Sequence, residues 1–325
     1  RLSFVALTSL TDDFEGLEDW FTDAVNVLAR GTTDELDGHL ISVGEVQTVG
    51  DTKTSCHIRF VTRDGNGRPM VSQLARMLVD HIVDFCIPRS RMNEALDHLE
   101  KTGSSAQLFA LQREAQGLFT SIDNSGEGGE LLLALLLERL LDAPQILCKM
   151  SLKTSAQMHV HGTDGVHVRA LDGGRLAVYW GESKLHETVQ SAISDAFKSI
   201  GPYLTDTGNG SSQRDLLLVR NHLDTGSSAV DDFLREYFTE GSVRATTREV
   251  RGASLVGFSI EDYPVPITEE GEIATDVADA IAGWHDLIKG RVATAGLESF
   301  DLTVFCIPLP SVADFRSAMK HALKV

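Results

Sequence analysis

The sequence has little of what marks secreted, disulfide-linked or membrane-spanning proteins. Four of its 325 residues are cysteine, and none of them shows Cys-x-x-Cys spacing. We therefore expect buried free thiols of a reducing cytoplasm, and neither a disulfide framework nor a metal knuckle, at Cys56, Cys86, Cys148 and Cys306. No uncharged apolar run reaches the roughly 18 residues of a membrane span, and no signal peptide is visible. These absences favour a cytoplasmic protein.

Basic residues are also scarce, since 29 Lys and Arg stand against 47 Asp and Glu, for a net charge of −18. A protein that binds nucleic acid unaided usually has a basic surface, because neutralising phosphates releases counterions. Two interpretations stay open. Either a partner supplies the contact with nucleic acid, or a local basic strip faces it, made of Lys149, Lys153, Arg169, Lys184 and Lys198.

The most informative feature is a predicted β-hairpin with ionisable residues at its open end. Its turn is Asp172-Gly173-Gly174, which we interpret as a three-residue loop. Val166 then faces Trp180, and most apolar residues of both strands share one face. A two-residue loop would shift the register by one and mix the faces, which a half-buried sheet resists.

In this register Asp164 faces Glu182, and Lys184 lies two residues further along the same strand face. All three therefore belong to the core-facing side of the hairpin, at its end. Ionised groups are rare there unless they are paired or bind a metal. Two carboxylates and a lysine in this arrangement would form a compact site for a divalent metal and a phosphodiester.

A leucine-rich helix is expected to supply a further carboxylate. The segment Glu127–Leu141 holds eight leucines and is apolar nearly all round, which indicates a buried helix. Glu130 lies in its first turn and Glu138 near its end. A glutamate on a buried helix needs a partner, which could be a metal shared with the hairpin carboxylates, Arg139 or a helix N-terminus.

The order of helical Glu, strand Asp and Glu-x-Lys, followed by an amphipathic helix, resembles the PD-(D/E)xK nuclease superfamily. Thr163 stands where that superfamily usually has proline. More specifically, Gly-Glu130-Leu-Leu-Leu, His-Gly-Thr-Asp164-Gly-Val-His-Val and Tyr-Trp-Gly-Glu182-Ser-Lys184-Leu resemble the HamA family, the nuclease subunits of bacterial Hachiman antiphage defence systems. The superfamily implies a restriction-endonuclease-like core with the order αβββαβ.

The resemblance also implies function. It implies hydrolysis of DNA that depends on Mg²⁺, or alternatively Mn²⁺, and a helicase partner encoded beside the nuclease. Carried over by position, the catalytic set is Glu130, Asp164, Glu182 and Lys184, with Asp164, Glu182 and Glu130 as metal ligands. Glu138 is the competing choice for the helical ligand. No base-reading module is apparent, so we expect low sequence specificity.

The residue types suit that chemistry. Mg²⁺ prefers oxygen ligands and is often held by one or two carboxylates, phosphate oxygens and water. It can polarise a scissile phosphate and activate water. A lysine beside it can orient the attacking water and offset the charge that builds on phosphorus.

Two other functions remain open. His159, His161, His167 and His186 cluster in the sequence and could hold zinc with Asp164, although no tight zinc signature completes the set. That would make the chain a zinc hydrolase. The chain could instead be a non-catalytic subunit whose acidic surface binds a partner.

The pattern along the chain predicts an α/β or α+β protein with a mixed sheet. The loop-like segment 122–129 suggests a boundary. Residues 1–125 would form a mixed α/β region that binds a partner or regulates, and residues 126–325 the nuclease domain. We expect helices over 20–28, 69–85, 91–101, 185–200, 227–238, 274–288 and from 311, strands near 57–61, 253–260 and 302–307, and a mobile loop over 205–213. Phe-Cys-Ile-Pro occurs at 85–88 and 305–308, which we interpret as coincidence because the flanks differ.

Overall fold

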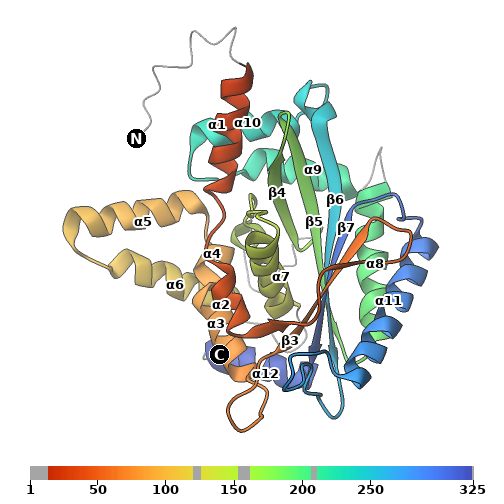
Figure 1. Ribbon diagram of the computed structural model, residues 1–325. Coiled ribbons are helices and arrows are strands. Elements are labelled where there is room, and N and C mark those ends of the chain that lie inside the picture. The colour runs from red at the N-terminus through yellow and green to blue at the C-terminus, as the bar shows by residue number, and fades with distance from the viewer. Residues whose placement is uncertain (1–13, 120–125, 153–161, 206–210, 324–325) are drawn as a thin grey trace.

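The computed structural model describes residues 14–119, 126–152, 162–205 and 211–323 (Figure 1). Its strands are β1 (Leu40–Ser42), β2 (Gln47–Thr48), β3 (Thr54–Val61), β4 (Gly165–Leu171), β5 (Arg175–His186), β6 (Arg248–Ser259) and β7 (Leu302–Leu309). Its α-helices are α1 (Phe14–Asn26), α2 (Thr33–Asp37), α3 (Val71–Asp80), α4 (Ile82–Cys86), α5 (Arg89–Thr102), α6 (Ala106–Leu118), α7 (Glu127–Leu140), α8 (Val189–Thr205), α9 (Ser211–His222), α10 (Ser228–Tyr237), α11 (Thr275–Ala295) and α12 (Val312–Leu323). The short 3₁₀ helices η2 (Lys149–Leu152) and η3 (Arg244–Thr247) complete the elements used below.

One mixed sheet organises the molecule. Its strands follow the order β1-β3-β7-β6-β5-β4, and β2 pairs with β3 outside this path. The two outer pairs, β1–β3 and β4–β5, are antiparallel, whereas the three inner pairs are parallel. The predicted class, an α/β protein with a mixed sheet, is confirmed.

Helices cover both faces of the sheet. Helices α8 and α11 pack on one face together with Trp180 and Val256, while α3, α7 and α12 pack on the other with Tyr179 and Leu255. Figure 1 shows α8 and α11 on the far side of the sheet from α7. Strand β7 is buried at every position, as expected for a central parallel strand covered on both sides. Helices α5 and α6 form a hairpin that projects from this body (Figure 1).

The predicted hairpin register is confirmed. Val166 faces Trp180 and Leu171 faces Arg175, which leaves Asp172–Gly174 as the loop. The two loop glycines have φ angles of 71° and 65°, the left-handed region that a hairpin loop of this kind requires. The face that carries Tyr179 is also buried, because α7 covers it, so the hairpin is not half-exposed as its alternation suggested.

The expected αβββαβ order differs at its first strand. Between α7 and β4, the described residues contribute an isolated bridge, in which Gln145 pairs with His167, and no strand. The observed order from α7 is therefore helix, bridge, two strands, α8 and, after two further helices, β6. Pro144 helps to explain why this segment forms a bridge and no strand, because proline donates no backbone hydrogen bond to a sheet ladder.

The predicted boundary does not interrupt the sheet. Residues 120–125 lie outside the described residues, but β3 before them pairs with β7 near the C-terminus, where Cys56 is in register with Val304. The two sides of the boundary thus share one sheet. The division into a regulatory region and a nuclease domain stays a prediction.

Most predicted elements are present, with differences at their ends. The predicted helix 69–85 is two helices, α3 and α4, that meet at His81, whose φ of −97° and ψ of 6° interrupt the regular helix. Helices α2, α6 and α9 and strands β1 and β2 were not predicted. Much of the predicted loop 205–213 falls outside the described residues, and its last three positions belong to α9. The repeated Phe-Cys-Ile-Pro lies at the end of α4 and inside β7, so the coincidence interpretation is confirmed.

The cysteines are free thiols, as predicted, and all four are among the described residues. Cys56 and Cys306 lie on neighbouring strands with their sulfur atoms 3.8 Å apart, and neither sulfur is bonded to the other. Within the described ranges, no helix is both long and apolar enough to cross a bilayer.

Candidate active site

Asp164 lies at the open end of the hairpin, where the sequence placed it. Its backbone N–H donates to the Gly181 carbonyl at 2.9 Å, which extends the β4–β5 pairing by one position and brings Asp164 opposite Glu182. Its Oδ2 accepts a hydrogen bond of 2.7 Å from the Ser183 N–H. The carboxylate is therefore held against the backbone of β5, between the two residues of the Glu-x-Lys motif.

Glu182 and Lys184 form a contact pair beside it. Glu182 is only 5% exposed, and the Lys184 ammonium donates to its Oε1. Burial raises the pKa of Glu182 to about 7, and the Asp164 charge adds to this shift while Lys184 opposes it. The pKa of Lys184 is also raised, because Glu182, Asp164 and Glu130 outweigh the effect of its burial. Two carboxylates thus repel each other beside one ammonium.

Glu130 reaches the same site from α7. Gly129 makes this possible, because a Cβ at that position would collide with the Ser183 hydroxyl and lie 3.1 Å from Leu185. The absence of a side chain lets the first turn of α7 approach β5 next to Lys184, whose pKa Glu130 helps to raise. The positive end of the helix dipole also favours carboxylates at this point. Asp164, Glu182 and Lys184 therefore lie together, whereas Glu130 comes from the side of β5 that α7 covers and is connected to them by the effect of its charge on Lys184.

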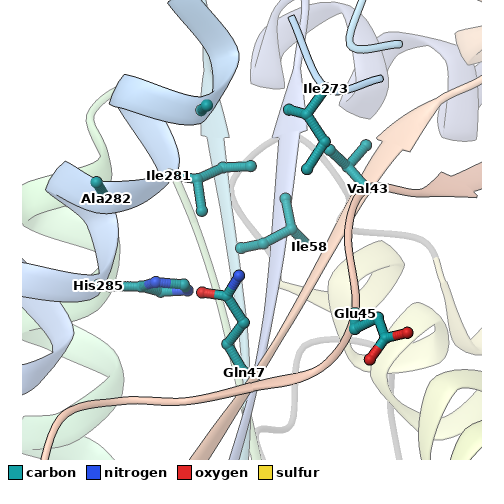
Figure 2. Close-up of a pocket in the computed structure, with 9 residues that line it drawn as sticks. Val43, Glu45, Gln47, Ile58, Ile273, Ile281, Ala282 and His285 are labelled. Atoms are coloured by element: carbon teal, nitrogen blue, oxygen red, sulfur yellow. The ribbon is translucent and has the colours of Figure 1, made fainter. Parts of the chain in front are cut away.

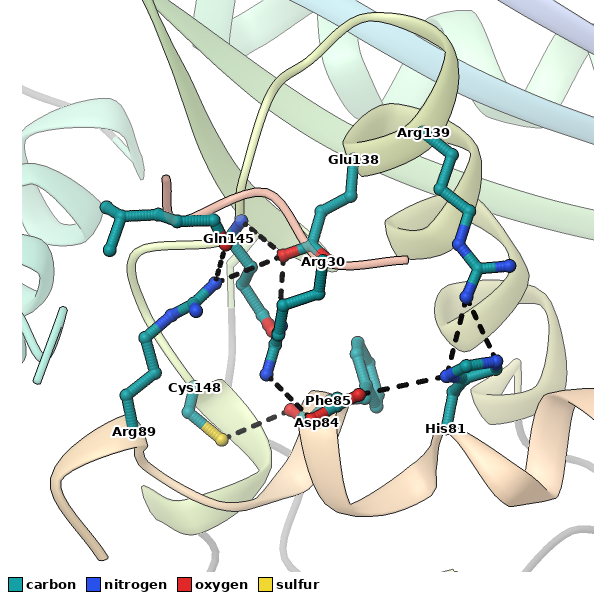
Figure 3. Close-up of polar contacts among 10 residues, drawn as sticks. Arg30, His81, Asp84, Phe85, Arg89, Glu138, Arg139, Gln145 and Cys148 are labelled. Carbon is teal, nitrogen blue, oxygen red and sulfur yellow. Dashed lines mark hydrogen bonds and ion pairs between the residues drawn. The ribbon is translucent and has the colours of Figure 1, made fainter. Parts of the chain in front are cut away.

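Glu138 lies elsewhere, at the other end of α7 and about 12 Å along its axis from Glu130. Figure 3 shows its carboxylate between two guanidinium groups. It accepts from Arg30 at 3.2 Å, from Arg89 at 3.3 Å and from the Gln145 N–H at 3.3 Å. Glu138 is therefore paired with these residues, and none of its contacts is with Asp164 or Glu182 among the described residues.

Arg139, the alternative partner considered for a helical glutamate, pairs with other residues. Its Nη2 lies 2.9 Å from Glu35 and 2.9 Å from the His81 ring (Figure 3). Together with Glu138, it fastens the end of α7 to the N-terminal helices.

Two buried residues that were not predicted from the sequence, Asp215 and Lys149, hold the residue before Asp164 in place. We call this pair the clamp. Asp215, fully buried on α9, accepts from the Thr163 N–H at 3.0 Å and from the Lys149 ammonium at 3.0 Å. Lys149 also donates to the Thr163 carbonyl. Gly162 permits this close approach, because a Cβ at this position would overlap the side chains of Asp215 and Lys149. Its φ of +131° is also one that residues with a side chain rarely adopt. Gly162, in the sequence His-Gly-Thr-Asp, was the feature of the sequence that could have indicated this close contact.

The clamp also corrects the predicted basic strip. Lys149 is only 6% exposed and ion-paired, so it does not face solvent. Lys184 lies in the site, and Lys198 is exposed on α8. Lys153 falls outside the described residues. Arg169 lies half-buried on β4, so Lys149 is the described member that the structure removes from the predicted strip.

The described histidines do not share a site. His167 is buried, its Nδ1 lies 2.9 Å from the Ala143 carbonyl, and burial lowers its pKa to about 4. His186 pairs with Asp195 at 3.1 Å. His167 is in register with Tyr179, seven residues before His186, which separates them by roughly 23 Å along the strand. These two cannot bind one zinc ion, and His159 and His161 lie outside the described residues.

The donor set fits a magnesium site better than a zinc site. Across the described ranges, no three His, Cys, Asp or Glu side chains form a group that could hold a metal ion. Mg²⁺, however, is commonly held by one or two carboxylates together with water and phosphate oxygens. Asp164 and Glu182 supply two such carboxylates. Burial raises the pKa of Glu182 and the Asp164 charge raises it further, and a divalent cation between the two carboxylates would offset both effects.

A separate cavity of about 230 Å³ is lined by residues that include members of β2, β3 and α11 (Figure 2). Apolar side chains such as Ile58 and Ile281 dominate its walls, with Gln47 and His285 at one side. It contains none of the predicted site residues, and it is smaller than the ~300–1,000 Å³ of typical ligand pockets. We do not assign a site to it.

Comparison with known proteins agrees with the motifs. No curated protein matches the chain. The HamA family matches residues 39–323, a span that includes all seven strands and all four predicted site residues. The family resemblance that the motifs indicated is therefore confirmed. The chain belongs to the HamA family and is thus a component of a Hachiman antiphage defence system.

Proposed function

We propose that this chain is a Mg²⁺-dependent deoxyribonuclease, the effector of its defence system. The observation that supports the proposal is the close arrangement of Asp164, Glu182 and Lys184 at the end of the β4–β5 hairpin, with the charge of Glu130 acting on Lys184 from α7. Three carboxylates and one ammonium, held on a strand pair and the first turn of a buried helix, match the needs of phosphodiester hydrolysis.

Each residue has a distinct role in the proposal. Asp164 and Glu182 would hold Mg²⁺, with Glu130 as a further carboxylate near it. When bound, Mg²⁺ supplies Lewis-acid polarisation of the phosphate and makes water a stronger acid. Lys184 lies within hydrogen-bonding distance of Glu182, where its ammonium orients the attacking water and offsets charge on the phosphate. The water oxygen would form a bond to phosphorus while the bond from phosphorus to the leaving oxygen breaks, and the leaving oxygen would take up the proton that the water gives up.

The partner is part of the proposal. A net charge of −18 repels DNA, and Lys149, one member of the predicted basic strip, is buried. A helicase subunit of the same system would bind DNA and deliver it to the site. The acidic surface then keeps the nuclease inactive on DNA that no helicase presents. Because no base-reading module is apparent, cleavage would have low sequence specificity.

The metal requirement can be tested with a conservative substitution. Purified protein, its helicase partner and ATP would be incubated with plasmid DNA in Mg²⁺ or in EDTA. We expect wild-type cleavage only in Mg²⁺ and a loss on the order of 10²-fold or more for Glu182→Gln, by analogy with the removal of one charge-stabilising group from an active site.

Glu187→Gln is the matched control, because Glu187 is an exposed glutamate just beyond β5 that accepts a hydrogen bond from the Ser259 hydroxyl. It should cleave like wild type. Cleavage in EDTA, or equal cleavage by Glu182→Gln and wild type, would contradict the proposed chemistry.

A further inference from the structure

A second, larger cavity lies over the β5–β6 pair and encloses about 490 Å³. This volume is within the range of small-molecule sites. Residues of β5, α8, α9 and β6 and of the segment that follows α10 line it, including Trp180, Tyr203, Arg220, Phe238, Glu240 and Arg248. None of Asp164, Glu182 and Lys184 is among its lining residues, so it is separate from the proposed nuclease site.

Aromatic rings form one part of the cavity wall. The rings of Trp180 and Tyr203 lie 5.6 Å apart at an interplanar angle of 39°. Trp180 is 1% exposed, and its indole N–H has no acceptor among the described residues. Buried tryptophan N–H groups normally find a partner. An aromatic wall with an unused donor suits a planar heterocycle that carries acceptor atoms.

Two arginines supply positive charge at the same cavity. The Arg248 guanidinium donates to the Tyr237 carbonyl at 2.8 Å and lies 6.0 Å from the Phe238 ring, but it has no carboxylate partner within the described ranges. Arg220 likewise makes no ion pair there. Glu240 lines the same cavity without pairing with either arginine.

Two arginines near the cavity, in contrast, have carboxylate partners. Asp and Glu outnumber Lys and Arg by 47 to 29, and neighbouring arginines use that excess. Arg235 pairs with Asp232, and Arg244 pairs with Glu236. Arg220 and Arg248, which meet no carboxylate among the residues that the structure describes, supply two positive charges at one cavity that an anionic ligand can use.

We propose that this cavity binds a nucleotide, with the base against Trp180 and Tyr203 and the phosphate at Arg220 and Arg248. Glu240 is then available to accept from an exocyclic amino group of the base. Trp180 precedes Glu182 by two residues on the same face of β5, roughly 7 Å away. The nucleotide can therefore be a free molecule or one unit of a DNA strand that passes the cavity.

Calorimetric titration of the full chain in EDTA tests the proposal without any need for the metal or for catalysis. The probes are dAMP, a short single-stranded oligodeoxynucleotide and inorganic phosphate. We expect dAMP or the oligonucleotide to bind, phosphate alone to bind more weakly, and Arg220→Gln to raise the Kd about tenfold or more, since the loss of one charge-assisted contact is worth roughly that factor.

Arg214→Gln is the matched control, because Arg214 is exposed on the same helix and does not line the cavity. Binding of dAMP would identify a free nucleotide, and binding of the oligonucleotide alone would identify a strand. The proposal is overturned if neither probe binds, or if Arg220→Gln and Arg214→Gln bind equally. Because the titration is independent of cleavage, it separates this proposal from the nuclease assignment.

Discussion

At the scale of single residues, the buried pair Lys149–Asp215 sets the position of Asp164. Asp215 and Lys149 bind the N–H and the carbonyl of Thr163, one residue before the candidate metal ligand. A shift of about 1 Å in a reacting group can cost on the order of 10²-fold in rate. Asp215 is therefore a positioning residue in the proposed mechanism, although it lies 51 positions from Asp164 in the sequence.

Asp215→Asn should lower kcat for DNA cleavage by about 10- to 100-fold with little change in KM, because Asp164 loses its fixed position while the DNA contacts remain. Cleavage should be measured well below the melting temperature, since Lys149 also loses its buried partner. The control is Asp232→Asn, which alters only an exposed pair with Arg235. A normal kcat in folded Asp215→Asn would show that the clamp serves stability alone.

His167 predicts a specific dependence of stability on pH. Burial lowers its pKa from 6.5 to about 4 in the folded protein, so the unfolded chain binds the proton more readily between these values. The contribution of His167 to stability should be complete above pH 6.5 and should be lost as pH falls toward 4, by about 3 kcal/mol in all. Urea unfolding of wild type and His167→Gln between pH 4 and pH 7 measures it. A pH-independent difference between the two proteins would contradict the assignment.

Residue types and spacing allowed much of the candidate site to be predicted from the sequence. Asp164, Glu182 and Lys184 belong to one hairpin, whose register follows from a local turn and a two-residue period. The contacts of Asp215 and of Glu138 could not be predicted in this way. They join segments that are far apart in the chain, and no local pattern reports such pairing.

At the scale of elements, α7 has two ends with different roles. Its first turn presents Glu130 to the candidate site, and its last turn is fastened through Glu138 to Arg30 and Arg89 (Figure 3). The leucines between the ends are buried in the core, so the helix is a rigid support. In the proposed mechanism, Glu130 thus serves catalysis, whereas Glu138 serves stability.

Substitution of each glutamate by glutamine should show this separation. Glu138→Gln should lower the free energy of unfolding by about 3 kcal/mol, because two partly buried guanidinium groups lose their carboxylate. Glu130→Gln should reduce cleavage and leave the free energy of unfolding within about 0.5 kcal/mol of wild type. Denaturant unfolding and DNA cleavage should be measured on both variants. Together they show which glutamate is needed for cleavage and which for stability. The reverse pattern would place Glu138 in the site.

The predicted and observed elements differ for identifiable reasons. Helix α9 begins at Ser211 in a segment rich in Ser, Gly and Asn, which indicates a loop by composition. The apolar pattern of residues 69–85 continues across His81, so the interruption between α3 and α4 could not be seen. Phe-Cys-Ile-Pro ends a helix in one place and lies in a strand in the other, because tertiary packing overrides such short patterns.

At the scale of the whole molecule, one sheet includes strands from both of the regions, 1–125 and 126–325, that the sequence predicted as separate domains. Strand β3 lies beside β7, although the two are separated by most of the chain. Parallel neighbours of this kind are set by long-range packing, which a single sequence does not reveal. The candidate site lies at the β4–β5 side of this sheet, supported by helices on both faces.

The acidic character of the chain makes a prediction about control. With a net charge of −18, the protein alone should bind DNA weakly and cut it slowly at physiological salt. The helicase partner with ATP should raise cleavage at least tenfold. Cleavage assays with and without the partner test this, and equal rates in both would contradict the proposed control.

The central claim, that the hairpin site cleaves DNA, is tested most directly at Lys184. Plasmid cleavage should be compared between wild type, Lys184→Ala and Lys198→Ala, in Mg²⁺ with the helicase and ATP. We expect Lys184→Ala to lose about 10²–10³-fold in rate, equivalent to ~2.7–4 kcal/mol of barrier. Lys198→Ala, which removes an exposed lysine from α8, should be fully active. Full activity of folded Lys184→Ala would contradict the claim.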